Sequence, residues 1–261
     1  MQNQETYNLA EIASCYAGLS HLEPAEETIL RLLAPKLPGA RMLDLGVGGG
    51  RTTLHFAKWM REYVGVDYSQ SMIRACRQRF AGYPPHIWFA VCDARAMGLF
   101  ETDSFDFILF SYNGIDYVGH EDRLKILKEV WRVGKPGGYF CFSSHNLNWA
   151  ANLFELRRMI SLDPRRAIQS AKRLVLRFVF NRGVPAAALR RSAWFVFNDG
   201  AHGRKLLTYY IRPLDQISQL EGDFEGVRVF SHVTGAELAD RNEIASDQDW
   251  WLYYLCRVKK T

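Results

Sequence analysis

A run of alternate glycines behind an aspartate is the feature of this chain that most directly suggests chemistry. Asp44 lies at the end of an apolar stretch short enough to be a buried strand, and Gly46, Gly48 and Gly50 follow it. A helical pattern begins at Thr52. A strand that turns through glycines into a helix brings bare backbone amides against a ligand, because no Cβ stands between them. A carboxylate at the mouth of that turn is costly unless a ligand or donor meets it, so the stretch predicts a nucleotide-type pocket.

The spacing of the glycines narrows the choice of nucleotide. A dinucleotide fingerprint requires G-x-G-x-x-G, but the sixth position holds Arg51 when counted from Gly46 and Thr53 when counted from Gly48. The phosphate-binding pattern G-x-x-x-x-G-K-[ST] is also absent from the sequence. What the chain carries instead is D-x-G-x-G-x-G over residues 44–50.

Two further aspartates stand at the ends of short apolar runs. Asp67 closes Tyr63–Asp67, 17 positions beyond Gly50, which is close to the roughly 20-residue interval at which an acid meets ribose hydroxyls. A carboxylate suits that task because it can accept two hydrogen bonds from a vicinal diol. Asp93 follows the third run, Ile87–Cys92. Any one of these acids could cap the next helix, but three in succession favour ligand binding.

The motif at residues 44–50 resembles the first motif of class I S-adenosylmethionine (SAM)-dependent methyltransferases. Residues 69–73 are similar to that family's D-x-S-x-x-M-[IL] segment, and the turn at residues 135–138 to its K-P-G-G turn. The Ala13-x-x-Tyr16 spacing resembles the entry segment of small-molecule methyltransferases, in which the last tyrosine closes over SAM; amphipathic packing is the alternative. The resemblance implies that SAM binds to Tyr16, Asp44, Gly46, Gly48, Gly50, Asp67, Tyr68, Met72, Asp93, Ala94 and Ser111. Within this set it implies that Tyr68 and Met72 lie near the adenine, Asp93 contacts its amino group and the Ala94 amide contacts a ring nitrogen.

The elements that would position these residues alternate between strand and helix. Strands are predicted at 42–45, 63–67, 87–92, 105–110, 139–144, 227–231 and 251–258, with helices at 121–133 and from Pro213 towards Gly222. The predicted fold is α/β, with a seven-stranded Rossmann-like methyltransferase sheet that is mostly parallel, an antiparallel last strand and helices on both faces. Residues 1–40 are expected to form a helical entry segment, and 41–146 with 209–261 to form the SAM-binding core.

Residues 147–208 form a long insertion after the fifth predicted strand, where a short link would suffice. Its segment 151–205 contains twelve Lys and Arg against three acids. The pattern predicts a basic helical lid, with an amphipathic helix from Asp163 whose polar face carries Arg165 and Arg173. One interpretation is an ordinary solvated face. The other is binding of an anionic acceptor group such as a phosphate, a nucleotide-sugar or an anionic lipid headgroup.

Candidate residues for the acceptor side should follow the fourth and fifth predicted strands. SAM is already activated, so the protein must align the nucleophile and, for oxygen, remove a proton. His145 is the first choice for a base or hydrogen-bonding group, because it carries the imidazole at such a strand end. There are two alternatives: the enzyme works by positioning its substrates without a base, or His145 only anchors the lid. The candidate catalytic residues are His145, Tyr112 and Asn113, and the candidate acceptor-binding residues are Asn146, Tyr209, Tyr210, Arg165 and Arg173.

Three classes of function follow from these patterns. The first is a methyltransferase that acts on an O or N atom of a small acceptor, anionic if the basic insertion binds it. The second is a tRNA or other nucleic-acid methyltransferase, which the basic insertion favours. The segment Ser111–Gly114 argues against it, because it lacks the proline pair that holds a flipped base. The third is a SAM-binding subunit without catalysis.

Composition and terminal patterns set the remaining expectations. Hydrophobic content of 48% and charged content of 23% are ordinary for a globular protein with a substantial core. No basic-then-apolar leader and no apolar run of about 18 residues is present in the sequence, which predicts a cytosolic protein. Peripheral contact with anionic lipid is left open by the basic insertion. No residues stand at zinc-ligand spacing, so SAM without a metal is the expected cofactor.

Overall fold

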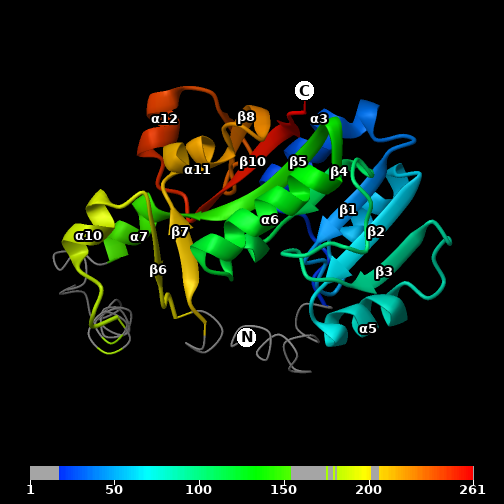
Figure 1. The fold of residues 1–261 in the computed structure, drawn as a ribbon, viewed down its shortest axis with the longest axis horizontal. Coiled ribbons are helices and arrows are strands. Elements are labelled where there is room, and N and C mark those ends of the chain that lie inside the picture. The colour runs from blue at the N-terminus through cyan, green and yellow to red at the C-terminus, as the bar shows by residue number, and fades with distance from the viewer. Residues whose placement is uncertain (1–17, 154–174, 176–178, 180, 201–205, 261) are drawn as a thin grey trace.

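The computed structural model describes residues 18–153, 175, 179, 181–200 and 206–260. One sheet runs through this part of the chain, with helices against both of its faces (Figure 1). Its strands lie in the order β3-β2-β1-β4-β5-β10-β8-β9, while β7 pairs with the end of β5 and β6 pairs with β7. They are β1 (Arg41–Leu45), β2 (Glu62–Asp67), β3 (Ile87–Val91), β4 (Phe105–Phe110), β5 (Gly134–Asn146), β6 (Trp194–Phe197), β7 (Thr208–Ile211), β8 (Phe224–Ser231), β9 (Glu237–Leu238) and β10 (Trp251–Val258).

All seven predicted strands are present, as β1 to β5, β8 and β10. The first five pair in parallel, and β10 is antiparallel to both of its neighbours, β5 and β8. The predicted Rossmann-like methyltransferase sheet is therefore confirmed. Two strands begin several residues earlier than predicted: β8 begins at Phe224, and β5 begins at Gly134 and includes the predicted turn at 135–138. Gly137 has a positive φ of 71° there, and the pairing register with β4 shifts in the same region.

The core lies on the two faces of this sheet, because successive strand residues point to opposite sides. Met42 and Tyr63 pack on one face, with Leu43 and Val64 on the other. Strands buried on both faces read as continuous apolar runs rather than alternating ones, which is the pattern that the sequence shows. Because β1 pairs in parallel with β2 and β4, the carboxyl ends of these strands meet at one edge of the sheet, where the candidate site lies.

Helices cover both faces of the sheet. The helices, including the short 3₁₀ turns labelled η, are α3 (Pro24–Leu33), η1 (Ala34–Lys36), α4 (Thr53–Phe56), η2 (Ala57–Trp59), α5 (Gln70–Arg79), η3 (Gly114–Asp116), α6 (His120–Val133), α7 (Leu147–Leu153), α10 (Ala186–Arg191), α11 (Pro213–Leu220) and α12 (Arg241–Ser246). Apolar residues of α3, α4 and α5 join the cluster on the Met42 face, and those of α6, α11 and α12 join the Leu43 face. The described part of the expected helical entry segment, residues 18–40, is helical at α3 and η1.

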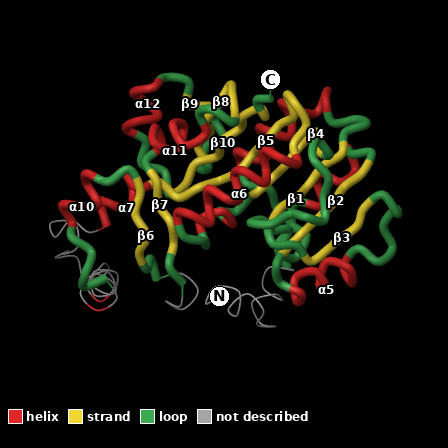
Figure 2. The backbone as a smooth tube through the Cα atoms, in the orientation of Figure 1, coloured by secondary structure: helices red, strands yellow, loops and turns green. Residues whose placement is uncertain are grey.

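The insertion at 147–208 is mixed rather than helical in its described residues. The helices α7 and α10 are present, but Trp194–Phe197 forms β6, which pairs with β7. Aromatic and branched residues in β6 favour a strand, and β7 offers it a partner because it extends the sheet beside the end of β5. Figure 2 shows this hairpin beside α7 and α10, where Phe197 and Tyr210 share a small apolar cluster. The predicted helix with Arg165 and Arg173 lies outside the described residues, as does Tyr16.

Candidate active site

The glycine turn after β1 adopts the backbone geometry that its sequence requires. Gly46, Gly48 and Gly50 have φ values of 64°, 54° and 81°, in the left-handed region that side chains rarely tolerate. A Cβ on Gly50 would meet Phe80 at 2.3 Å, whereas a Cβ on Gly48 would find its nearest neighbour at 3.9 Å. Gly50 therefore allows tight packing beneath the turn, and Gly48 leaves open space above it.

A pocket opens above this turn at the carboxyl ends of β1, β2 and β4. It encloses about 920 Å³ when the open space at its mouth is included. The predicted residues that line it are Asp44, Gly46, Gly48, Asp67, Tyr68, Met72, Ala94, Ser111 and Tyr112. The sequence thus brings most of its predicted cofactor residues into one cavity.

Asp67 is the acid best placed to meet a ligand in this pocket. Its carboxylate accepts the backbone N–H of Gly48 at 3.1 Å and of Ser69 at 2.8 Å. The side chain is buried, and burial raises the pKa of Asp67 to about 6, although the two N–H donors act in the opposite direction. The carboxylate retains acceptor capacity beyond these two bonds, which suits a vicinal diol.

The carboxylate of Asp44 is hydrogen-bonded by side chains of the protein itself. Its Oδ2 accepts hydrogen bonds from the hydroxyls of Thr52 and Tyr63, both at 2.5 Å. Burial raises the pKa of Asp44 to about 6, and the two hydroxyls partly offset that effect. Of the two possibilities that the sequence left open, a ligand or a donor, donors within the protein meet this carboxylate, and Asp44 also lines the pocket.

Asp93 is held by an arginine that the sequence prediction did not include. Arg95 donates to both Asp93 oxygens and also pairs with Asp122 at 2.7 Å. The hydrogen bonds from Arg95 lower the pKa of the Asp93 carboxyl. Asp93 lines a second pocket of about 1070 Å³, which adjoins the first through shared walls that include Ala94 and Tyr117. The inserted hairpin region contributes Val196 and Leu207 to this second pocket.

A buried ion pair closes the other end of the first pocket. Arg51, which follows the glycine turn, contacts both carboxylate oxygens of Glu26 at 2.5 and 2.6 Å. It also donates to Ser111 at 3.2 Å, and its guanidinium lies over the Tyr112 ring at 4.8 Å. Ser111 in turn donates to Glu26. The sequence pattern identified Ser111 but neither member of the pair.

The loop after β4 supplies the wall on the predicted acceptor side. Tyr112 and Asn113 both have left-handed φ values, 56° and 59°. The backbone N–H of Asn113 donates to Ser143 at 2.7 Å, which fixes the loop against β5. Tyr117 at the end of this loop lines both pockets.

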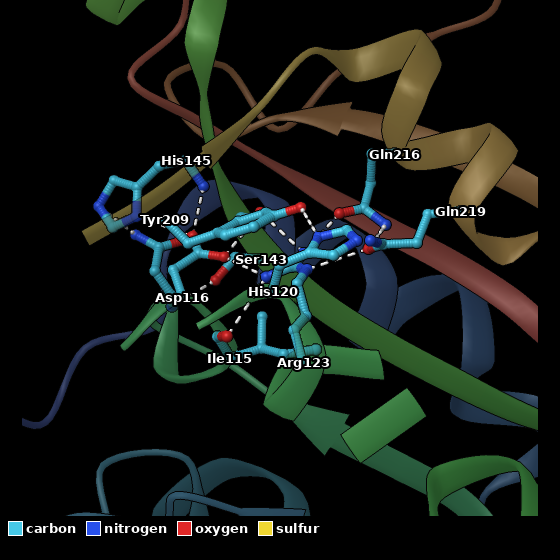
Figure 3. Close-up of polar contacts among 11 residues, drawn as sticks. Ile115, Asp116, His120, Arg123, Ser143, His145, Tyr209, Gln216 and Gln219 are labelled. Carbon is cyan, nitrogen blue, oxygen red and sulfur yellow. Dashed lines mark hydrogen bonds and ion pairs between the residues drawn. The ribbon is translucent and has the colours of Figure 1, made fainter. Parts of the chain in front are cut away.

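His145 lies behind this wall in a buried polar network (Figure 3). Its Nδ1 is 2.8 Å from Asp116 Oδ2, and its backbone N–H donates to the same oxygen at 2.6 Å. The other Asp116 oxygen accepts hydrogen bonds from Arg123 and from Ser144. Gln216 also accepts from the fully buried Arg123. Asp116 and Arg123 were not predicted as site residues.

Three predicted acceptor-binding residues lie outside both pockets. Asn146 is tied to Asp247 through its side-chain amide at 3.1 and 3.2 Å. The Tyr209 hydroxyl lies 2.9 Å from His120 Nδ1, and Tyr210 donates to Asp199 at 3.1 Å. None of the three lines either pocket, although the Tyr210 ring lies 4.9 Å from that of His145.

Neither a metal cluster nor a membrane span is found in the described residues. Their His, Cys, Asp and Glu side chains form no group of three or more that could hold a metal ion. None of their helices has the length and apolar character needed to cross a bilayer.

The strand order, the glycine turn and Asp67 at the end of β2 together define the architecture of a class I SAM-dependent methyltransferase. Residues 42–138 match the family model described as a methyltransferase domain. Residues 42–138 are therefore a methyltransferase domain of the class I SAM-dependent type.

Individual relatives agree with that assignment. Over 108 residues the chain is 37% identical to a demethylmenaquinone methyltransferase of Clavibacter sepedonicus, covering 41% of this chain and 42% of that protein. A ubiquinone/menaquinone biosynthesis C-methyltransferase of Desulfotalea psychrophila is 35% identical over 106 residues, covering 39% of this chain and 40% of that protein. The matches thus span about half the length, or less, of these curated relatives. A SAM-dependent methyltransferase structure from Mesorhizobium loti shares the fold, with a TM-score of 0.61 and 21% identity over 89% of this chain and 97% of that one.

Proposed function

We propose that this protein binds SAM in the pocket above the glycine turn and transfers its methyl group to a small-molecule acceptor. The observation that carries the proposal is the meeting of Asp67, the open backbone at Gly48 and the Ser111–Tyr112 wall around one cavity. SAM supplies an activated methyl group on a sulfonium, so the protein has to bind, align and, for a protic acceptor, remove a proton.

The residues of the pocket fit the parts of SAM. The Asp67 carboxylate suits the ribose hydroxyls, because it keeps acceptor capacity beyond its two backbone bonds. Met72 and Phe110 give apolar walls for the adenine, as does the body of Tyr68. Arg51 and Ser111 also line the pocket, and their polar groups suit the amino-acid part of SAM.

The acceptor enters from the side of the loop after β4. We propose an O or N atom as the methyl acceptor, with Tyr112, Asn113 and His145 on the acceptor side. Arg95 already donates to both carboxylate oxygens of Asp93. The proposed contact between Asp93 and the adenine amino group therefore uses the remaining lone pairs of these oxygens. An anionic acceptor group remains part of the proposal through the basic insertion, whose arginines Arg165 and Arg173 would receive it.

Calorimetry with SAM, S-adenosylhomocysteine and NAD tests the cofactor. We expect SAM and S-adenosylhomocysteine to bind at micromolar Kd, equivalent to about 8 kcal/mol, and NAD to be ignored. Asp67→Ala should weaken SAM by roughly 1–3 kcal/mol, since the ribose hydroxyls lose a charged acceptor. Binding of NAD without SAM would end the proposal.

Transfer of tritiated methyl from SAM to a metabolite extract tests the reaction. Label should enter a small molecule, and RNase treatment of the extract should leave the yield unchanged. RNase-sensitive labelling would favour a nucleic-acid methyltransferase instead. Tight SAM binding without labelling of extract or tRNA would favour a binding subunit without catalysis.

A further inference from the structure

Two polar atoms close to His145 lack hydrogen-bond partners among the described residues. They are the side-chain carbonyl oxygen Oδ1 of Asn113 and the indole Nε1 of Trp251, and both are buried. Asn113 as a whole is only 4% exposed. Buried polar atoms are nearly always hydrogen-bonded, so an acceptor and a donor left open together indicate that something else binds there. They offer opposite hydrogen-bonding roles, as recognition of a polar group requires.

His145 neighbours both of these residues. Its Nε2 is 3.4 Å from the amide nitrogen of Asn113, and its ring is 6.1 Å from that of Trp251, edge to face. Trp251 and His145 are directly paired residues of β10 and β5, which places their side chains on the same face of the sheet. The side chains therefore form one cluster rather than two separate irregularities.

Asp116 orients the imidazole within this cluster. A carboxylate only accepts hydrogen bonds, so the Nδ1 of His145 carries the proton in the 2.8 Å contact with Asp116. The Nε2 atom then holds a lone pair, which accepts a long 3.4 Å hydrogen bond from the amide N–H of Asn113 that the acceptor would have to replace. This is the arrangement of a base whose orientation is fixed by a second group.

Arg123 balances the charge of Asp116. The two form an ion pair in which both side chains are fully buried. Arg123 therefore helps to hold the Asp116 carboxylate in place beside His145.

Aromatic rings surround this buried cluster, whose own residues line neither pocket. Tyr117 stands edge-on to His145 at 6.4 Å, and Tyr210 lies at 4.9 Å. Tyr112 reaches the Trp251 ring at 6.2 Å, and both Tyr112 and Tyr117 also line the first pocket. A flat, unsaturated molecule fits such walls better than a flexible aliphatic one.

We propose that the acceptor is a flat molecule with a protic nucleophile, a hydroxyl, enol or N–H group, and that His145 Nε2 takes its proton. The inference rests on the proposed function. As the nucleophilic O or N attacks the methyl carbon, the carbon–sulfur bond breaks and its electron pair goes to sulfur, giving S-adenosylhomocysteine. The acceptor proton moves to Nε2 and later leaves to solvent. Asn113 Oδ1 and the Trp251 indole N–H bind polar atoms of the same acceptor, and Asp116 is a positioning residue.

The first test is the protonation state of His145 in the wild-type protein. Nitrogen-15 spectra of histidine-labelled protein, assigned with His145→Gln, should show a proton on Nδ1 and none on Nε2 at pH 8. Asp116→Asn should alter this tautomer preference, because the asparagine side chain can also donate. A proton on Nε2 in the wild-type protein would overturn the proposal without any knowledge of the acceptor.

The second test uses methyl transfer to the metabolite extract. His145→Gln should lower transfer at saturating SAM by about 10²–10⁴-fold, the usual contribution of a general base, and leave the Kd for SAM unchanged. Wild-type transfer should rise with pH to a plateau. The His145→Gln rate should keep rising tenfold per pH unit, because the acceptor must ionise by itself. His120→Gln is the matched control: it loses a contact with Tyr209 in the same region and should keep the wild-type profile.

The pH profile of methyl transfer also depends on the charged groups near His145. The titratable and charged groups that face His145, directly or through one residue, are Asp116, Arg123, Tyr117, Tyr210, Asp199, His232 and Asp249. Burial lowers the pKa of His232, so His232→Gln should leave the wild-type profile in place.

The outcomes separate the two proposals. Wild-type protein that neither binds SAM nor labels any molecule would refute the proposed function and this inference with it. Wild-type labelling that His145→Gln leaves equally fast, or a labelled product whose methyl group sits on an atom that carried no hydrogen, would refute the inference alone.

Discussion

The affinity for SAM should fall as the pH is lowered through about 6, because the ribose hydroxyls need an ionised acceptor. Burial raises the pKa of Asp67 to about 6 in the free protein. About one carboxylate in eleven is then ionised at pH 5, and nearly all are ionised at pH 7.5. If only the ionised form binds SAM well, the Kd at pH 5 is about tenfold higher, equivalent to ~1.4 kcal/mol. Asp44, whose pKa burial also raises to about 6, can steepen the dependence but not reverse it.

Calorimetric titration with S-adenosylhomocysteine from pH 5 to 7.5 at constant ionic strength measures this dependence. Asp67→Asn should bind more weakly at pH 7.5 and lose the share of the slope that Asp67 contributes. Asp93→Asn is the control, because Arg95 lowers the pKa of Asp93 and keeps it ionised across this range. A wild-type affinity that is flat with pH, or a slope that Asp67→Asn leaves intact, would refute the reasoning.

The stability of the unliganded protein should depend on pH with the opposite sign. The folded pKa of Asp67 lies above its ordinary value of 3.8. Its contribution to the free energy of unfolding is therefore present below that value and is lost as the pH rises through about 6. Asp67→Asn should remove this loss, so the difference in Tm between variant and wild type should grow in favour of the variant from pH 4 to pH 7. Thermal melts at these two pH values check the sign.

Three further predictions follow from the turn, the metal question and the insertion. Gly50→Ala should lower the Tm strongly, because a left-handed φ costs a residue with a side chain roughly 1–2 kcal/mol and the contact with Phe80 adds overpacking of about 1–3 kcal/mol. Gly48→Ala should lower the affinity for SAM more than it lowers the Tm, because the added Cβ would extend into open space. EDTA should leave methyl transfer unchanged, and a loss restored by Mg²⁺ would contradict this. Neutralising Arg165 and Arg173 should raise the acceptor KM several-fold without changing the Kd for SAM, and added salt should mimic the change. Unchanged acceptor kinetics with a large drop in Tm would show that these arginines are structural.

The parts of the fold that sequence predicts well are those with local signals. The glycine turn and Asp67 were located correctly because strand, turn and acid follow each other within a short stretch, and each has its own residue preference. Met72 follows in the same way, since it lies in the first turn of α5 after the Ser69 cap. The positions of these residues follow from their neighbours in the sequence and do not depend on distant contacts.

The parts that sequence did not predict depend on partners that are distant along the chain. Asp116 and His145 are 29 residues apart, and Arg51 and Glu26 are 25 apart. Glu26 also accepts a hydrogen bond from the backbone of Glu23, a capping contact that gives no hint of its second role. Only tertiary packing brings such side chains together, because no pattern in either segment refers to the other.

The β6–β7 hairpin was missed for a different reason. Residues 194–197 are too few for their periodicity to identify a strand, even though their partner β7 begins only eleven residues later. The charge pattern of that insertion drew attention to helices instead. The aromatic run Trp194–Phe197 was the signal that could have indicated a strand.

The place of β10 in the sheet has a consequence for how the chain is synthesised. This strand follows every other strand along the chain, yet it lies between β5 and β8. Translation at about 5–20 residues per second leaves the edge of β5 without that neighbour for roughly 5–20 seconds, because about 100 residues separate the two strands. An uncovered strand edge is a template for pairing with other chains. We expect aggregation of nascent chains to rise when synthesis is slowed between residues 146 and 251, and to be insensitive to slowing before β5.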